Sequence, residues 1–387
     1  MWEVRNDMQT MEEVKQDIIA YSKEIGIDTI GFTTADVFSQ LKQRLIEREH
    51  TNYNSGFEKG SVEERTNPEV LLTGAQSIIS VALAYPSRMM HPPKSTKGNR
   101  RGIFCRASWG MDYHVVLKDR LQKLDSFIKE KIPHVTTNIM VDTGELSDRA
   151  VAERAGVGFS GKNTSIITKD YGSYVYLGEM ITTLPLPPDK PIEEGCGDCT
   201  RCMDACPTGA LVQGGQLNAQ RCIAYLTQTK DFLPDEFRTK IGTRVYGCDT
   251  CQAVCPYNHQ IDVHAHDEFE PDPEVAKPLL RPMLRMSNRE FRETFGHISG
   301  FWRGKNPLQR NAMIGLAHFK DETSVDTLIE VLEKDVRPVI RGTAAWALGK
   351  IGGEKANAAI LKAREIEEDE RVLVEMDKGL AYAQKEA

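Results

Sequence analysis

The chain has 387 residues, a formal net charge of −7 at pH 7, and 40% hydrophobic and 27% charged residues. This length allows two or three domains with separate cores, and an acidic balance taken alone argues against a nucleic-acid partner. No stretch approaches the roughly 18 apolar residues that a membrane helix needs, and the polar segment Met1–Gln9 is unlike a signal peptide. We therefore expect no membrane contact.

Helices and short strands alternate in the first half of the chain. Apolar residues at helical spacing predict helices over 10–26, about 35–49 and 113–131, with a helix-like segment over 146–155. Short runs rich in β-branched residues predict strands. The expected strands cover 27–34, 78–85 and 136–142. This pattern predicts a mixed α/β or α+β domain that ends near residue 185, where four prolines follow between 185 and 191.

Eight of the nine cysteines fall between residues 196 and 255. The first run, Cys196 to Pro207, follows C-x2-C-x2-C-x3-C-P, the spacing of a bacterial ferredoxin segment that holds a [4Fe–4S] cluster. The second run, Cys248 to Pro256, has Val254 where a third cysteine is expected, and Cys222 completes the count. Zinc is the competing interpretation, but zinc sites typically use separated C-x2-C pairs. Cysteines at metal spacing, rather than in a disulfide framework, also indicate a reducing, cytoplasmic compartment.

In two-cluster ferredoxins the fourth cysteine of each run ligates the other cluster. Crossed ligation of this kind predicts two ligand sets. The first set is Cys196, Cys199, Cys202 and Cys255. The second set is Cys206, Cys222, Cys248 and Cys251. Two clusters in one chain carry electrons singly to a further reaction centre.

The last hundred residues repeat with a period of 32. Ala312, Gly315, Leu316 and Ala317 fall on Ala344, Ala347, Leu348 and Gly349, and then on Met376, Gly379, Leu380 and Ala381. Residues 325–332 and 356–363 supply partner helices. A helix pair of this length, with small residues at the packing positions, predicts a HEAT-like α-solenoid. So few repeats suggest a domain that leans on its neighbour, either as a binding surface or as a stabilising appendage.

Two segments are locally basic despite the acidic total. One consists of Lys94, Lys97, Arg100, Arg101 and Arg106. The other, residues 281–310, holds six arginines and one lysine against Glu290 and Glu293. The ordinary interpretation is a solvated, salt-bridged surface, and the alternative is contact with phosphates.

Two further motifs fail their context tests. The letters Gly156-x-Gly-x-x-Gly161 follow a helix-like segment rather than a strand, so they do not predict a dinucleotide site. Asp112-Tyr-His114 begins like a D-x-H-x-x-G cobalt-ligand signature, but Leu117 stands in the position of the glycine. We therefore expect His114 to make structural or polar contacts.

The combination of motifs resembles the epoxyqueuosine reductase family. The segments that carry the resemblance are 106–114 (RASWGMDYH), 141–149 (VDTGELSDR), 155–163 (AGVGFSGKN) and the two cysteine runs. The resemblance covers essentially the whole chain, including the helical repeats that only some members carry. It implies reduction of epoxyqueuosine to queuosine at the tRNA wobble position.

The resemblance also implies the cofactors. Members bind cobalamin base-off in the N-terminal α/β domain, without a protein ligand to cobalt, and two [4Fe–4S] clusters are refilled by an external donor of flavodoxin or ferredoxin type. Asp142 matches the aspartate proposed as proton donor. That role requires burial against the corrin to raise the pKa of Asp142. Without the resemblance, a turn after a strand is the simpler interpretation of Asp142.

Further cofactor contacts follow from the same resemblance. They are Cys105, Lys162, Ser165, Thr208, Tyr225 and Asp249. Cys105 is equally a small buried hydrophobe, and Lys162 is equally an exposed cation. The tRNA contacts are expected from the two basic segments, with Phe301 and Trp302 as possible base-stacking residues, although core packing is the usual fate of such aromatics.

The predicted class is α+β with three domains. A cobalamin-binding catalytic domain covers 1–185, a ferredoxin-like double-cluster domain 186–275, and a HEAT-like domain 276–387, in a monomeric protein. One alternative function is a corrinoid iron–sulfur reductase of a small molecule such as an organohalide. Those enzymes typically carry a twin-arginine signal, and none is visible here. The other alternative is a ferredoxin-type electron-transfer adaptor.

Overall fold

A computed structural model describes residues 2–386 and the side chains of residues 11–382. The predicted absence of a signal peptide concerns residues 1–9, whose side chains lie outside the described part. The chain forms two compact units, each assembled from separate segments. The first unit comprises 1–88, 111–220 and 250–270, and the second comprises 89–110, 221–249 and 271–387. The three predicted domain boundaries stay a prediction.

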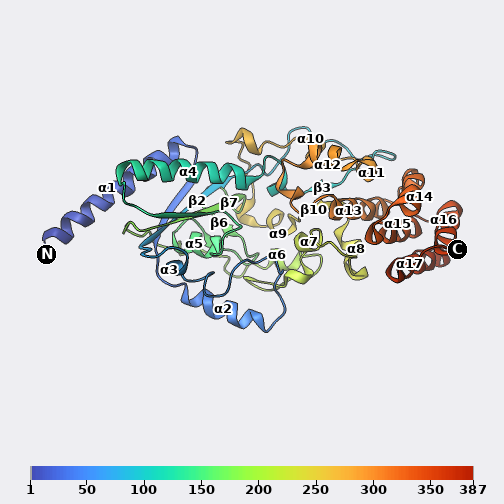
Figure 1. The fold of residues 1–387 in the computed structure, drawn as a ribbon, viewed down its shortest axis with the longest axis horizontal. Coiled ribbons are helices and arrows are strands. Elements are labelled where there is room, and N and C mark those ends of the chain that lie inside the picture. The colour runs from blue at the N-terminus through green and yellow to red at the C-terminus, as the bar shows by residue number, and fades with distance from the viewer. Residues whose placement is uncertain (1, 387) are drawn as a thin grey trace. The chain divides into compact units, whose positions relative to one another are not determined.

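The first unit is built on an antiparallel sheet in the order β1-β2-β7-β4. Figure 1 labels its two central strands, β2 and β7. Its strands are β1 (Thr29–Thr34), β2 (Ser77–Ala84), β4 (Thr137–Met140) and β7 (Val175–Thr182). Its longer helices are α1 (Trp2–Glu24), α2 (Ser39–Glu49), α4 (Tyr113–Lys131) and α5 (Asp148–Arg154). Shorter elements are α3 (Pro68–Leu71), β5 (Phe159–Ser160), β6 (Ile166–Ile167), α6 (Arg201–Asp204), β8 (Leu211–Gln213), β9 (Gln216–Leu217) and α9 (Thr250–Ala253).

Helices cover both faces of this sheet. On one face Gly178 of β7 lets α4 approach, because a Cβ there would lie 2.9 Å from the Leu117 side chain. On the other face a Cβ at Gly31 would collide with the carbonyl of Ala155, which directly follows α5. Every residue of β2 is buried, as expected for a central strand covered on both faces. The predicted mixture of helices and sheet is therefore confirmed.

Strand β7 was missed by the sequence analysis, which places no strand between 142 and 185. It pairs with β2 over its full length and with β4. Gly178 and Glu179 stand in its middle, and both residue types are depleted in strands. Pairing on both edges outweighs those local preferences.

The second unit is mostly helical. Its small strands are β3 (Ile103–Phe104) and β10 (Arg244–Tyr246), which pair in parallel. Its shorter helices are α7 (Ile223–Leu226), α8 (Asp235–Ile241), α10 (Pro273–Ala276), α11 (Leu280–Arg285) and α12 (Asn288–Phe295). The helices of the repeat are α13 (Lys305–His318), α14 (Val325–Lys334), α15 (Pro338–Ile351), α16 (Glu354–Arg364) and α17 (Glu370–Glu386).

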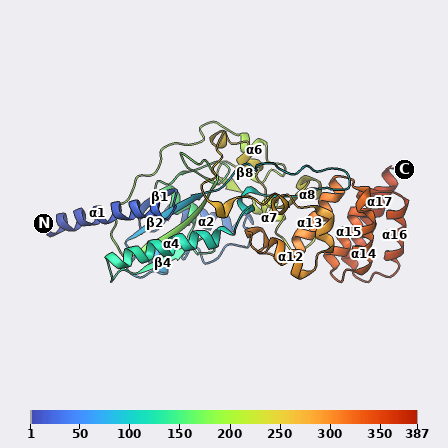
Figure 2. The same cartoon turned by 90° about the horizontal axis from the view of Figure 1, so that it is seen from above.

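The predicted helical repeat is confirmed, and α13 to α17 stack side by side in Figure 2. Its small residues mark where helices touch. A Cβ at Gly349 of α15 would collide with the backbone of Gly379 of α17, and one at Gly379 would lie 2.7 Å from the carbonyl oxygen of Ala345. The small residues of the last two repeats therefore allow backbone contact between α15 and α17, whereas Gly315 of α13 lies against the Leu280 side chain.

The first repeat helix also supports the segment that follows Cys222. Arg310 of α13 is 1% exposed and donates hydrogen bonds to the carbonyls of Leu226, Thr229 and Asp231. Its neighbour Asn311 donates to the carbonyls of Thr227 and Val245. The repeats therefore pack in one core with residues 221–249, as we expected of a domain with too few repeats to be stable alone.

Candidate functional site

The first predicted ligand set lies within the first unit. Cys196, Cys199, Cys202 and Cys255 line one small cavity together with Lys162 and Asn163. Burial, and then the neighbouring Cys196 sulfur, raise the pKa of Cys202. Burial and the same sulfur raise the pKa of Cys255. Cysteines of both runs therefore line one cavity, and their assignment to one cluster stays a prediction.

This cavity has the polar donors that a sulfur-rich cluster needs. The backbone N–H of Lys162 lies 3.3 Å from the Cys196 sulfur. Asn163 is buried, and its side-chain nitrogen has no hydrogen-bond partner among the described residues. N–H groups directed at cluster sulfurs stabilise the bound cluster and adjust its potential. The donor set therefore fits a [4Fe–4S] cluster held by these four cysteines.

The side chain of Lys162 contacts the loop that carries Cys196 and Cys199. Its ammonium donates to the carbonyl oxygen of Gly197 at 2.6 Å and to that of Cys199 at 3.1 Å. Ser165 closes the adjacent turn, since its carbonyl accepts from Gly161 and its N–H donates to Asn163. Both residues therefore shape the first cysteine run, and their contact with cobalamin stays a prediction.

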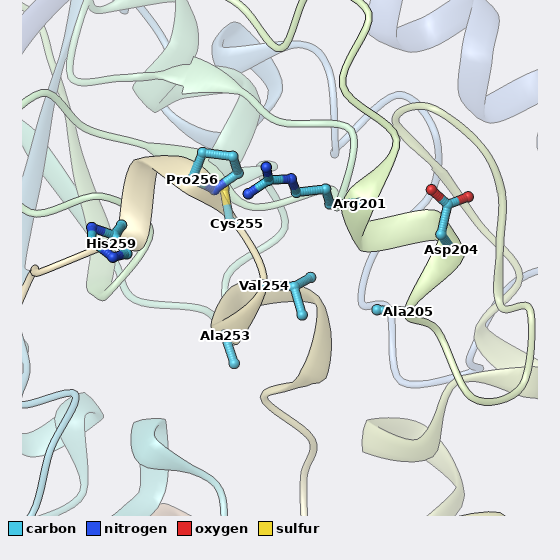
Figure 3. Close-up of a pocket in the computed structure, with 8 residues that line it drawn as sticks. All are labelled: Arg201, Asp204, Ala205, Ala253, Val254, Cys255, Pro256 and His259. Atoms are coloured by element: carbon cyan, nitrogen blue, oxygen red, sulfur yellow. The ribbon is translucent and has the colours of Figure 1, made fainter.

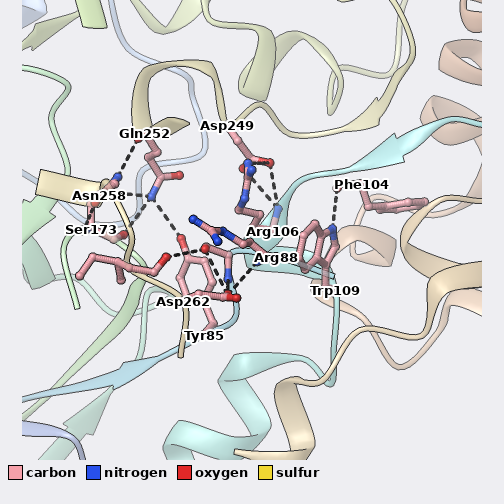
Figure 4. Close-up of polar contacts among 12 residues, drawn as sticks. Tyr85, Arg88, Phe104, Arg106, Trp109, Ser173, Asp249, Gln252, Asn258 and Asp262 are labelled. Atoms are coloured by element: carbon pink, nitrogen blue, oxygen red, sulfur yellow. Dashed lines mark hydrogen bonds and ion pairs between the residues drawn. The ribbon is translucent and has the colours of Figure 1, made fainter. Parts of the chain in front are cut away.

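A polar network attaches the second cysteine run to the first unit (Figure 4). The Gln252 side chain donates to the carbonyl of Ser173 at 2.9 Å and to the Tyr85 hydroxyl at 3.2 Å. Asn258 accepts from the backbone N–H of Ser173 and donates to its hydroxyl. These hydrogen bonds fix α9, which contains Cys251, and the segment after it, which contains Cys255, beside the sheet.

Val254, which replaces the expected cysteine, lines a cavity of about 890 Å³ between α6 and α9 that shares Arg201, Cys255 and Pro256 with the cavity of the first ligand set (Figure 3). Arg201, Asp204, Ala205, Ala253, Cys255, Pro256 and His259 complete its lining. In Figure 3 the Arg201 side chain extends toward Cys255 and Pro256. Val254 is therefore not among the residues that line the cavity of the first ligand set.

The four cysteines of the second predicted ligand set come from segments of both units. Cys206 and Cys251 belong to the first unit, and Cys222 and Cys248 to the second. The surroundings of Cys206 favour its thiolate form. Burial raises the pKa of this thiol, but hydrogen bonds from the N–H groups of Thr208, Leu211 and Ala210 outweigh burial, and the net pKa is lowered. Thr208 also places its hydroxyl 3.7 Å from the Cys206 sulfur. This set, with the cofactor contact of Thr208, stays a prediction.

Asp142 stands two residues after the end of β4, in a loop that ends at α5. Its φ of +52° lies in the left-handed region, which aspartate tolerates better than most residues. The Asp142 Oδ2 atom lies 3.4 Å from Nε2 of His114, and Nδ1 of His114 lies 2.7 Å from Oδ1 of Asp112. Burial disfavours the charged imidazole, but the two carboxylates outweigh it and raise the pKa of His114 to about 9.

The pKa of Asp142 differs from the sequence-based expectation. The hydrogen bond from His114 lowers it, against a smaller opposing effect of burial. The Asp142 side chain is 61% exposed, and its desolvation does not outweigh the hydrogen bond from His114. In this arrangement the proton of the pair resides on His114.

The second unit contains three residues that the sequence analysis assigned to cofactor contacts, namely Cys105, Tyr225 and Asp249. The Cys105 N–H donates to the Tyr246 carbonyl at 2.9 Å, and a Cβ at Gly247 would collide with the Cys105 sulfur. Burial raises the pKa of the Cys105 thiol. Asp249 accepts two hydrogen bonds from the N–H of Arg106 and pairs with its guanidinium at 3.0 Å (Figure 4). Tyr225 packs against the core of this unit. Cofactor contacts of Cys105, Tyr225 and Asp249 stay predictions.

The two basic segments are largely neutralised by acids. Arg101 pairs with Glu274, Arg285 with Glu330, and Arg289 with Glu293. Phe301 packs against the core of the second unit, whereas Trp302 is 53% exposed and donates its indole N–H to Gln228. The salt-bridged interpretation therefore describes most of these residues, and base stacking remains a prediction that Trp302 fits better than Phe301.

Two features were missed by the sequence analysis. A cavity of about 1250 Å³ in the first unit is rich in basic side chains and is here named the arginine cavity. Its cations are Arg44, Arg48, Arg65, Arg149, Arg154 and Lys162. These residues are dispersed in sequence, so no local run reveals them. The other feature is Glu179, a single carboxyl group in the apolar strand β7, which is a signal visible in the sequence.

Comparison with known proteins places these features in a family. Family models match residues 195–258 (4Fe-4S double cluster binding domain), 65–143 (epoxyqueuosine reductase QueG) and 305–374 (HEAT repeats). An epoxyqueuosine reductase of Bacillus cereus is 64% identical over 369 residues, 95% of this chain and 97% of that protein.

Solved structures agree over the same length. A crystal structure of epoxyqueuosine reductase with an epoxyqueuosine-modified tRNA stem loop has a TM-score of 0.95 and 61% identity, and covers 97% of this chain and 100% of that one. The enzyme from Bacillus subtilis, with its catalytic aspartate loop swung out of the active site, has a TM-score of 0.94 and 61% identity over 96% of this chain and 99% of that one. Within the described residues, no helix has the length and apolarity to cross a membrane.

Proposed function

The chain belongs to the epoxyqueuosine reductase family, and on that premise we propose that it reduces epoxyqueuosine to queuosine at the wobble position of tRNA. The observation that carries this function is the 64% identity to a named reductase over 95% of the chain. The reaction takes two electrons and two protons, converts the epoxide into a carbon–carbon double bond, and releases the epoxide oxygen as water. The protein must therefore deliver electrons, protons and the modified base to one place.

Electrons reach the reaction through the iron–sulfur segment. Residues 195–258 match the double-cluster family, and the first ligand set converges on a cavity with suitable donors. Clusters transfer single electrons, so they are refilled stepwise by an external low-potential donor of flavodoxin or ferredoxin type. The crossed assignment of the second set, including Cys222, belongs to this proposal.

Cobalamin is the proposed second cofactor, and the residues of the first unit are compatible with it. Its amides and its phosphate would be held by the arginine cavity, by Lys162 and by Ser165. His114 already contacts Asp112 and Asp142, which agrees with base-off binding without a protein ligand to cobalt. When bound, cobalamin supplies low-potential electrons to the epoxide carbon.

The proton for the departing oxygen comes from the pair of His114 and Asp142. At neutral pH this pair holds one proton, because the pKa of His114 is raised to about 9 by its two carboxylate neighbours after the opposing effect of burial. Asp142 faces solvent with more than half of its side chain and is the member of the pair that can reach substrate. As alkoxide character develops, the proton passes from His114 through the Asp142 carboxyl group to the departing oxygen. General acid catalysis of this kind contributes on the order of 10²–10⁴-fold.

The substrate is a base in an anticodon loop, where nucleotides can turn outward and stack on aromatic side chains. A related enzyme 61% identical to this chain was crystallised with an epoxyqueuosine-modified tRNA stem loop. We assign base or backbone contacts to Trp302 and to the basic segments 94–106 and 281–310, and we expect one chain to act as a monomer.

A substrate comparison tests this function. The protein is purified without oxygen, loaded with iron, sulfide and cobalamin, and supplied with a low-potential reductant. We expect turnover of epoxyqueuosine-containing tRNA and none of an aryl halide of similar reactivity. Turnover of the halide alone would support the organohalide alternative. Absence of both cobalamin binding and tRNA binding would leave only the electron-transfer adaptor.

A further inference from the structure

Glu179 of β7 lies on the sheet face that α5 covers. Its direct partners on the neighbouring strands are Met140 of β4 and Ser80 of β2, and Ser80 is in turn opposite Gly31 of β1. Residues directly opposite one another in a sheet point to the same face. Since Gly31 faces Ala155 at the end of α5, the Glu179 carboxyl group also lies beneath that helix.

The surroundings of Glu179 are apolar on both sides along the strands. Ile78 and Ile181 pack with Val151 of α5 on one side. Ala82 packs with Ala152 and Ala155 on the other. Glu179 is 0% exposed, and neither carboxyl oxygen accepts a hydrogen bond from a donor among the described residues. An ionised carboxyl group without a partner is strongly destabilising in such a place, so the group is held as the neutral acid.

The Glu179 carboxyl group needs an acceptor for its proton. The Asp148 side chain, on the first residue of α5, interacts with it and can accept that proton. The other contact of Asp148 leads to the reaction site, because its Oδ2 atom accepts the backbone N–H of Asp142 at 2.9 Å. That amide belongs to the residue whose φ is +52°, a conformation that needs support from its neighbours.

We propose that Asp148 and Glu179 are positioning residues for Asp142. The Glu179 carboxylic acid donates its proton to the Asp148 carboxylate, and this carboxylate holds the Asp142 amide so that the Asp142 side chain faces His114. One proton shared by Asp148 and the buried Glu179 therefore keeps the loop of residues 142–147 in its reactive position. This inference rests on the proposed role of Asp142 in the reaction.

The pKa directions agree with this geometry. Burial, followed by the charge of Asp148, raises the pKa of Glu179 well above its usual value. Burial, followed by the charge of Asp142, raises the pKa of Asp148 to about 6. At neutral pH the pair therefore holds one proton and one negative charge. Loss of the Glu179 proton would place like charges on Asp148 and Glu179, and the contact between them would break.

Other charged groups near the pair make hydrogen bonds with other residues. On α5 itself, Arg149 donates to the carbonyl of Thr164, Arg154 donates to Thr33 and Thr34, and Glu153 accepts from the N–H of Ser160. Strands β1, β2 and β4 contain no titratable side chain, and in the loop Asp142 faces His114. Arg149 also interacts electrostatically with Asp148 and Asp142. The state of the shared proton therefore depends on Asp148, Glu179, Asp142 and the charge of Arg149.

The first test measures hydrogen exchange of the loop in the cofactor-loaded protein. In Asp148→Ala the Asp142 amide loses its acceptor, and we expect the amides of residues 142–147 to exchange roughly tenfold faster or more. Asp148→Asn keeps an oxygen acceptor and serves as the matched control, with exchange close to that of the unsubstituted protein. Equal protection of the loop in all three proteins would overturn the proposal.

The second test concerns the proton. Glu179→Gln still donates to Asp148 but has no proton to lose. We expect the infrared band of a protonated carboxyl group to disappear in this variant while loop exchange at neutral pH is unchanged. As the pH rises, the loop should loosen in the unsubstituted protein and stay protected in Glu179→Gln at the same pH. Since both proteins contain His114, a difference between them reports Glu179 alone, and identical loosening contradicts the proposal.

Failure of this inference is distinguishable from failure of the proposed function. Exchange and infrared spectra do not depend on turnover. If Asp142 were not the proton donor, Asp142→Asn would retain activity, yet Asp148→Ala would still loosen the loop. If the positioning role fails, Asp148→Ala keeps both loop protection and the single-turnover rate.

Discussion

The His114 ring lies between two carboxylates, with Nε2 3.4 Å from Asp142 and Nδ1 2.7 Å from Asp112. Asp112 also accepts the backbone N–H of His114 and caps the N-terminus of α4, so the ring is held by the residue that caps its helix. The arrangement keeps the imidazole protonated at neutral pH and lowers the pKa of Asp142. The site therefore stores its proton on the histidine of the pair.

The pH dependence follows from this raised pKa. His114 binds its proton below about pH 9 and loses it as the pH rises through that value, so the single-turnover rate should fall on the alkaline side. In His114→Gln we expect a rate about 10²-fold lower and no fall near pH 9. The measurement is the rate constant of queuosine formation across this pH range at saturating reductant. An unchanged alkaline limb in His114→Gln would assign the titration to another group.

Replacement of Asp142 separates its chemical role from its structural one. Asparagine tolerates a positive φ and can still contact His114, but it cannot transfer a proton. We expect Asp142→Asn to keep iron content and cobalamin absorption and to lose about 10²–10⁴-fold in single-turnover rate. Asp142→Ala should lose at least as much and also loosen the loop. A rate for Asp142→Asn within about threefold of the unsubstituted protein contradicts the donor role.

The first ligand set is tested by iron content. Cys202→Ser removes a buried ligand of the first cavity, and we expect roughly half of the cluster iron to be lost after anaerobic reconstitution. Cys105→Ser, which changes the cysteine outside both sets, should retain all of it. Equal iron content in the two variants would show that Cys202 is not a ligand.

The buried Arg310 predicts a large effect on stability. Arg310→Met leaves the carbonyls of Leu226, Thr229 and Asp231 without their donor, and we expect a loss of about 3 kcal/mol in free energy of unfolding. The matched control is Arg289→Ala, whose side chain is 87% exposed and pairs only within its helix, with a change below about 0.5 kcal/mol. Thermal unfolding of both variants measures the difference. Equal melting temperatures would show that the hydrogen bonds of Arg310 do not stabilise the segment that follows Cys222.

The sequence predicts those features that depend on local spacing. The cysteine runs, the helix over 113–131 and the 32-residue repeat can all be read without tertiary information, since each has its own period or ligand spacing. The contact of Gly349 with Gly379 gives the physical reason for the small residues of that repeat.

Features that depend on distant partners could not be predicted. Strand β7 contains strand-depleted residues and is held by pairing with β2 and β4. Arg285 is neutralised by Glu330, 45 positions later, so its local run looked more basic than the folded surface is. The lowered pKa of Asp142 arises from His114, which precedes it by 28 positions on a different element. The contact between Asp148 and Glu179 likewise needs the sheet to be known.

The central claim is that this chain removes the epoxide oxygen from epoxyqueuosine in tRNA. The most direct measurement incubates the protein, with both clusters and cobalamin bound, with epoxyqueuosine-containing tRNA and a low-potential reductant under anaerobic single-turnover conditions. The nucleosides are then analysed by mass spectrometry. We predict that epoxyqueuosine is replaced by a nucleoside lighter by one oxygen atom, identical to queuosine, only when cobalamin is present. Unchanged epoxyqueuosine in the presence of intact clusters and bound cobalamin would contradict the account.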